Sequence, residues 1–278
     1  MNDYIPDIPG AFPLTYSQES LWFLHKLDPI SSAFNGVFIH KITGELDIAV
    51  LEKSLNAIVK YQDSFRAIFP DLEGRPYQLT RPFETFSLPV IELDKFSNDD
   101  HENQIVQLAR DETHRAFDLA NGPLFRFRLY TAGGVHYLLF AVHHIITDAW
   151  SKQIFLKDLQ LCYSAYAIGR EPDFPPMPMT YQQYAQYERE TMQGERLEQH
   201  LDFWRKRLGE NPPVLNLFPD HSLQIGATER ATVHTIRLEK AISDEFQVFC
   251  REHKMTLYTG IVAIFNALLY RVIPGRKH

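Results

Sequence analysis

Cysteine is scarce in this sequence, and so are several features that mark particular classes of protein. The 278 residues contain only Cys162 and Cys250. Two cysteines cannot form a disulfide framework, and no group of cysteines and histidines has the spacing of zinc ligands. Both lie in apolar, helix-like patterns that are typical of buried reduced thiols. We therefore expect no metal site.

Basic residues are not in excess, and glycine-rich phosphate loops are missing. The formal net charge is −7 at pH 7, which argues against a nucleic-acid-binding protein. No glycine-rich loop follows any expected strand, so chemistry driven by a bound nucleotide is not expected. Longer apolar runs are lacking too: residues 257–273 include Asn266 and Arg271, whereas a membrane span needs about 18 apolar residues. Without a signal peptide pattern at its start, the chain is expected to be soluble, cytoplasmic and free of membrane contacts.

What the sequence does contain is a clear strand-forming pattern. Residues 34–43 are rich in β-branched and aromatic residues, as strands are. Residues 124–130 alternate between apolar and polar, whereas residues 135–142 are almost wholly apolar and should lie deeper in the sheet. Between them, the pair Gly133-Gly134 supplies the positive-φ residues of a tight hairpin turn.

Helical patterns occur between and after these strands. They are predicted over residues 47–60, 99–115, 150–168 and 181–208, with two more helices ending near residue 272. Asp47 is a suitable cap for the first. A short hairpin is predicted over residues 65–80 and a strand near 231–238. Strands and helices mix without βαβ alternation, which predicts an α+β fold. Four prolines within residues 171–179 indicate a lobe boundary.

Two histidines and an aspartate, His143-His144-Ile-Ile-Thr-Asp148, stand where the apolar strand gives way to a helix. Adjacent side chains of a strand point to opposite sides, so one histidine can face the core and the other a cleft. Imidazole suits a reaction in which an amine or hydroxyl loses a proton as it attacks an acyl carbon. Asp148 could orient the loop by pairing with a cation. The alternative is a hydrogen-bonded pair of core histidines with Asp148 as a helix cap.

The segment HHIITDAW resembles the HHxxxDG signature of condensation domains of nonribosomal peptide synthetases. Further segments resemble that family's motifs in the same order: PLTYSQESLWFLHKLDP (13–29), YQDSFRAIF (61–69), FDLANGPLFRFRL (117–129) and YQQYAQYERE (181–190). The resemblance implies an α/β two-layer sandwich with two lobes, each similar to chloramphenicol acetyltransferase and meeting at a tunnel. Residues 1–175 would form the N-terminal lobe, and 176–278 the incomplete beginning of the second.

The resemblance also implies a reaction and its partners. Condensation domains join a donor acyl or peptidyl thioester to an acceptor aminoacyl thioester through an amide bond. Both groups arrive on phosphopantetheine arms of carrier proteins, so no intrinsic cofactor is expected, and an adenylation domain is expected as a neighbour. By match to the motif, His144 is the catalytic histidine, as a general base or by holding the amine. His143 and Asp148 are structural, and Asp148 is expected to pair with Arg66.

Some positions depart from the family pattern. Glycine at the end of the signature is replaced by Ala149, and other replaced positions are Ser20, Tyr61, Gln62, Gln183 and Tyr187. The substrate subtype is therefore not inferred. Because the second lobe is incomplete, the isolated chain is expected to be inactive.

Other activities on the same scaffold stay open. An ester-forming relative is not separated from an amide-forming one. An epimerisation domain has a different opening segment, so residues 18–24 argue against it. Heterocyclisation domains carry aspartates in place of the two histidines. A non-catalytic, carrier-recruiting relative usually lacks the catalytic histidine, whereas His144 is present.

Overall fold

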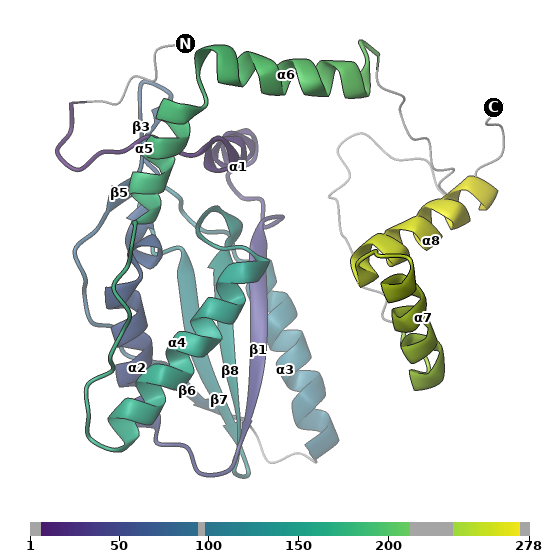
Figure 1. The fold of residues 1–278 in the computed structure, drawn as a ribbon. Helices are drawn as coiled ribbons and strands as arrows, with labels where there is room; N and C mark the ends of the chain where they lie inside the picture. The colour runs from purple at the N-terminus through teal and green to yellow at the C-terminus, as the bar shows by residue number, and fades with distance from the viewer. Residues whose placement is uncertain (1–6, 94–97, 212–235, 273–278) are drawn as a thin grey trace. The chain divides into compact units, whose positions relative to one another are not determined.

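A computed structural model describes residues 7–93, 98–211 and 236–272 (Figure 1). The chain divides into two compact units, residues 1–203 and 204–278. The first unit contains α1 (Tyr16–Leu27), β1 (Asn35–Thr43), α2 (Ile48–Tyr61), the 3₁₀ helix η1 (Asp63–Arg66), β2 (Ala67–Ile68), β3 (Asp71–Leu72), β4 (Arg75–Pro76), β5 (Leu79–Thr80), β6 (Val90–Glu92), α3 (Asn98–Thr113), β7 (Phe125–Ala132), β8 (Val135–His143), the 3₁₀ helix η2 (His144–Ile146), α4 (Ala149–Ala167) and α5 (Tyr181–Thr191). Helix α6 (Gly194–Leu208) contains the boundary, and the second unit holds α7 (Lys240–Glu252) and α8 (Leu257–Val272).

The main sheet of the first unit has the strand order β1-β8-β7-β6. Strands β7 and β8 form the predicted hairpin across Gly133 and Gly134, whose φ angles of 52° and 81° suit a tight turn. Strand β1 runs antiparallel to β8, and Asn35 lies opposite His143. The apolar strand β8 is therefore interior, as its composition predicts. It carries the two histidines to one end of the sheet.

Helices cover both faces of this sheet (Figure 1). Helices α2 and α4 contribute apolar side chains to one cluster with Leu138 and Phe140 of β8. Helix α3 contributes Ile105 to the opposite cluster, which contains Leu139 and Ala141 of the same strand. The alternation of a strand's side chains explains this division. It also explains why β8 is apolar on both faces along most of its length.

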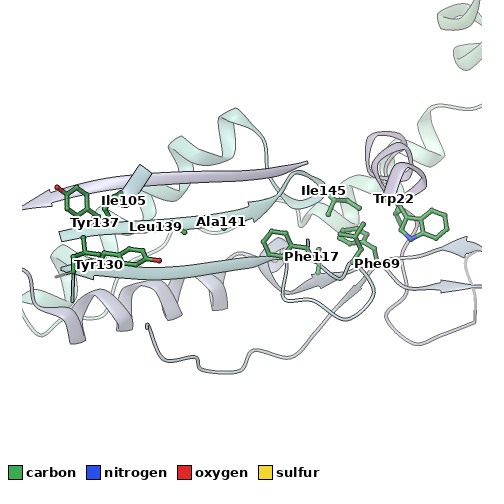
Figure 2. Packing of buried hydrophobic residues seen from close by; sticks show 14 of the residues in the cluster. Trp22, Phe69, Ile105, Phe117, Tyr130, Tyr137, Leu139, Ala141 and Ile145 are labelled. Atoms are coloured by element: carbon green, nitrogen blue, oxygen red, sulfur yellow. The ribbon is translucent and has the colours of Figure 1, made fainter. Parts of the chain in front are cut away.

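The cluster on the α3 face reaches the loop that follows β8. Figure 2 shows Ile145 of that loop beside Phe117, Phe69 and Trp22, at the end of the cluster opposite Tyr130. Ile145 is only 3% exposed. Burial of an isoleucine side chain stabilises a fold by about 1.5–3 kcal/mol, so this residue anchors the loop to the core.

The structure confirms the α+β class and corrects several details. The single helix predicted over residues 181–208 is wrong, because α5 ends at Thr191 and α6 begins at Gly194, whose φ of 55° interrupts helical geometry. Strand β6 was not predicted, because its three residues are all exposed and show no alternation. The strand predicted near 231–238 lies mostly outside the described residues.

Helix α5 packs against the start of α1 within the first unit. Nε of Arg189 donates to the Leu14 carbonyl at 2.7 Å, and the Tyr16 amide donates to Oε2 of Glu188 at 2.8 Å. The lobe boundary near residue 175 stays a prediction. Among the described residues, no single helix is long and apolar enough to cross a membrane. Helices α7 and α8 meet that criterion only as a pair bent by 103°.

Candidate active site

His143 is the last residue of β8, and its side chain faces the core. It is 4% exposed, and its ring lies near those of Phe34 and Phe117, with centroid distances of 6.4 and 6.2 Å. Its Nδ1 accepts a hydrogen bond of 3.0 Å from the amide of Ile145. Burial, with smaller contributions from His25 and His144, lowers the pKa of His143 to about 4. The ring is therefore neutral at pH 7 and holds the loop in place.

Stability is predicted to fall on acidification because His143 must remain neutral in the fold. Its folded pKa is about 4, against 6.5 for an unperturbed histidine. As pH falls, His143 takes up a proton in the unfolded chain before it does so in the folded chain. The stability that comes from the neutral, buried ring is therefore complete above about pH 6.5 and is lost between about pH 6.5 and 4. The difference corresponds to about 3 kcal/mol of unfolding free energy.

The measurement is denaturant unfolding across that pH range for the chain and for His143→Asn. Asparagine can still accept the hydrogen bond from the Ile145 amide but does not titrate. The loss of stability between about pH 6.5 and 4 that is due to His143 should therefore disappear. His114→Asn, at an exposed position just after α3, is the control and should behave like the parent chain. An unchanged pH profile in His143→Asn would contradict the assignment.

His144 points the other way, into a cleft. Its main-chain amide donates to the Phe34 carbonyl at 2.8 Å, and its Nδ1 lies 3.2 Å from the Thr147 carbonyl. A carbonyl only accepts, so in the neutral ring the proton of that bond is on Nδ1. Nε2 then keeps its lone pair. The two histidines thus face opposite sides, as the strand alternation predicts.

Asp148 caps helix α4. Its Oδ1 accepts hydrogen bonds from the Ser151 amide at 2.7 Å and the Ser151 hydroxyl at 2.6 Å. These bonds are the main cause of the lowered pKa of its carboxyl group. Ala149 is the first residue of α4 and has no positive φ. The alanine in place of glycine therefore requires no strained backbone.

The predicted ion pair between Arg66 and Asp148 is wrong. The Arg66 guanidinium pairs with Asp63 within η1 and donates to the carbonyls of Val59 at 3.2 Å and Arg81 at 2.8 Å. The guanidinium of Arg66 is thus bound by acceptors near η1, and the carboxylate of Asp148 is engaged in capping helix α4. Arg66 instead stabilises η1, which forms part of the cleft wall.

The first helix holds the histidine loop from the other side. Thr15 and Gln18 form a capping box at the start of α1, and Nε2 of Gln18 also donates to the Ile145 carbonyl at 3.3 Å. Both side chains are buried. The opening segment of the sequence therefore helps to position the residue that follows His144.

The cleft around His144 has a volume of about 540 Å³. Its lining consists of Ser17, Gln18, Leu21, Gln62, Asp63, Ser64, the loop 144–148, Ser151, Met177, Met179 and Tyr181. Sequence reasoning missed the two methionines, which come from the proline-rich segment. Tyr61 holds that segment, because its ring stacks on Phe174 at 4.0 Å and its hydroxyl donates to the Pro175 carbonyl at 2.7 Å. The sequence signal that could have placed this segment is the aromatic residue within the proline run, Phe174, because an aromatic side chain there needs a packing partner.

Metal chemistry has no evident donor set in the part of the chain that the structure describes. No group of three or more histidine, cysteine, aspartate or glutamate side chains is placed there to hold a metal ion. What the cleft offers instead is one imidazole nitrogen with a free lone pair, in a lining of hydroxyl, amide, thioether and carboxylate groups. This arrangement can accept a proton or orient a hydrogen-bond donor.

Comparisons with known proteins identify the family to which the sequence is similar. The profile of the family described as the condensation domain matches residues 9–277. One of the linear gramicidin synthase proteins of Brevibacillus parabrevis is 33% identical over 260 residues, which are 93% of this chain and 3% of that protein. The dimodular nonribosomal peptide synthase of Bacillus subtilis is 29% identical over 273 residues, 96% of this chain and 11% of that protein. The chain thus spans a small part of these relatives.

Solved structures share the fold. A doubly mutated form of the starter condensation domain of rhizomide synthetase superposes with a TM-score of 0.64 at 21% identity, over 72% of this chain and 46% of that chain. The X-domain from teicoplanin biosynthesis gives a TM-score of 0.81 at 23% identity, over 99% of this chain and 60% of that chain. These likenesses confirm the predicted fold class.

Proposed function

Because this chain belongs to the condensation domain family of nonribosomal peptide synthetases, we propose that it carries the catalytic histidine of an amide-forming acyltransferase. The donor is an acyl or peptidyl thioester and the acceptor is an aminoacyl thioester. Each is attached to the phosphopantetheine arm of a carrier protein. The amine nitrogen attacks the thioester carbon, a C–N bond forms, and the C–S bond breaks to release the carrier's thiol.

The observation that carries the proposal is the free Nε2 of His144 in the cleft. Nδ1 is engaged by the Thr147 carbonyl, so Nε2 is the atom that can accept the amine proton or hold the amine for attack. The departing thiolate takes up a proton to balance the reaction. General acid–base groups of this kind typically contribute about 10²–10⁴-fold to a rate.

The remaining site residues act as supports in this proposal. His143 fixes the loop from the core side, and Asp148 fixes the helix that follows it. Arg66 holds η1, whose Asp63 and Ser64 line the cleft. None of them is required to exchange a proton with substrate.

The substrates determine the partners. Thioesters are already activated, so the reaction needs no intrinsic cofactor and relies on phosphopantetheine brought by the donor and acceptor carrier proteins. In the proposed organisation, residues 1–175 form the N-terminal lobe, residues 176–278 begin the second, and an adenylation domain is a neighbour. The reaction is placed in the cytoplasm, without membrane or nucleic acid.

The test uses a longer chain in which this sequence is followed by the rest of a second lobe. It is mixed with a loaded donor carrier and with acceptor carriers bearing either an amino acid or its hydroxy-acid analogue, and products are identified by mass spectrometry. An amide from the amino acid alone is the expected result. An ester, an epimerised donor, or carrier binding without product would instead identify an ester-forming, epimerising or recruiting relative.

A further inference from the structure

A small pocket lies beside the His144 cleft, inside the first unit. Its volume is about 80 Å³. The residues that line both spaces are Gln62, Ser64, Ile146, Thr147 and Ser151. The pocket therefore lies next to the position of a substrate whose reacting atoms are at His144.

The inner walls of the pocket are mainly hydrocarbon. Beyond the shared border, the lining residues are Ile58, Phe65, Phe140, Ile154, Phe155 and Asp158. Phe140 and Phe155 stack with ring centroids 4.6 Å apart and are buried, so packing fixes their positions. Ile154 is 42% exposed, and shortening it should disturb the core little. This residue allows the depth of the pocket to be changed.

One carboxyl group also borders the pocket. Oδ2 of Asp158 accepts a hydrogen bond of 2.9 Å from Nε2 of Gln62. Burial raises the pKa of the Asp158 carboxyl group, because a low-dielectric environment disfavours its charged form. The Gln62 amide partly satisfies this group, and the larger part of the wall is apolar.

We propose that this pocket receives the side chain of a substrate acyl group and selects short aliphatic side chains. The inference rests on the proposed function of the cleft. At about 30 Å³ for each water-sized group, the pocket matches roughly three such groups, as in a propyl side chain. Each buried methylene group strengthens binding by about fourfold. The gain ends where the side chain meets the stacked rings of Phe140 and Phe155.

The test measures, by NMR titration of the longer, two-lobed chain, the dissociation constants of amide analogues of aminoacyl-pantetheine thioesters. The amides carry alanine, 2-aminobutyrate, norvaline, norleucine or 2-aminoheptanoate. A series with free amino groups represents the acceptor, and a series with acetylated amino groups represents the donor. In one of them, affinity should rise about fourfold per methylene group up to norvaline and then fall. The series with this break identifies which substrate uses the pocket.

Two variants make the test specific to the pocket. Ile154→Ala should move the break to longer side chains, whereas Ile168→Ala, at the end of α4 and outside both linings, should leave it unchanged. A flat or unbroken series, no binding, or an unmoved break in Ile154→Ala would overturn the proposal. Tighter binding of the 2,4-diaminobutyrate amide than of the norvaline amide would also overturn it, because Asp158 would then set the preference.

This result can be separated from the proposed function. His144 does not line the small pocket, so His144→Ala should keep the same chain-length profile. If affinity falls beyond one side-chain length but the two-lobed chain forms no amide, the proposed function alone is contradicted. Amide formation with a flat binding series would contradict the pocket alone.

Discussion

Residues 1–278 on their own are expected to produce no amide above the uncatalysed rate from loaded donor and acceptor carriers. The family resemblance places the reaction in a tunnel between two lobes, and this chain covers 46% and 60% of the two solved structures described above. A second wall orders the thioester and the amine, and such ordering can contribute about 7–11 kcal/mol to lowering the barrier. Product is followed by mass spectrometry.

The control is the longer chain with a second lobe, tested with the same carriers. The isolated chain is also expected to self-associate, because α7 and α8 expose many apolar side chains and large apolar patches are seldom left in water. The exposed side chains on these helices include Ile242, Phe249, Tyr258, Ile264, Phe265 and Leu268. Light scattering coupled to gel filtration reports the oligomeric state. Amide formation by a monodisperse monomer of residues 1–278 would show that one lobe is sufficient.

His144→Ala in the two-lobed enzyme should lower the rate of amide formation by about 10²–10⁴-fold while leaving the melting temperature nearly unchanged. The side chain projects into the cleft and makes its one hydrogen bond to a carbonyl three residues away, so its removal costs little stability. His114→Ala, another exposed histidine bonded to a nearby carbonyl, is the matched control and should retain full activity.

Added imidazole separates the two ways in which His144 can act. Partial recovery of the His144→Ala rate would indicate proton transfer, and no recovery would favour positioning of the amine. A loss smaller than about tenfold would mean that His144 provides neither, since a group with an acid–base role contributes more. A large drop in melting temperature would instead indicate that the side chain supports the fold.

The sequence was most informative where structure depends on neighbours in the chain. Helix α2 begins after Asp47, whose Oδ1 accepts from the Val50 amide at 3.0 Å, as the cap pattern predicts. The hairpin of β7 and β8 follows from alternation and a glycine pair. The opposite orientation of His143, the last residue of β8, and His144, the first of η2, agrees with the alternation expected at the end of a strand. The motif resemblance then predicts that His144 is the catalytic histidine, which stays a prediction.

Contacts between distant segments needed the tertiary structure. Arg66 was expected to pair with Asp148, yet the nearer acceptors around η1 bind it. Gln18 reaches the Ile145 carbonyl across 127 positions of sequence, and Tyr61 holds the segment that brings Met177 and Met179 to the cleft.

Periodicity and capping reveal local conformation and which residues are buried, because both depend on residues within a few positions of one another. They carry no information about which of several polar groups a long side chain will reach once the sheet and helices have packed. The type of fold, the histidine loop and its orientation were therefore readable from the amino acids. The partners of Arg66, the walls of the cleft and the side pocket were decided by packing.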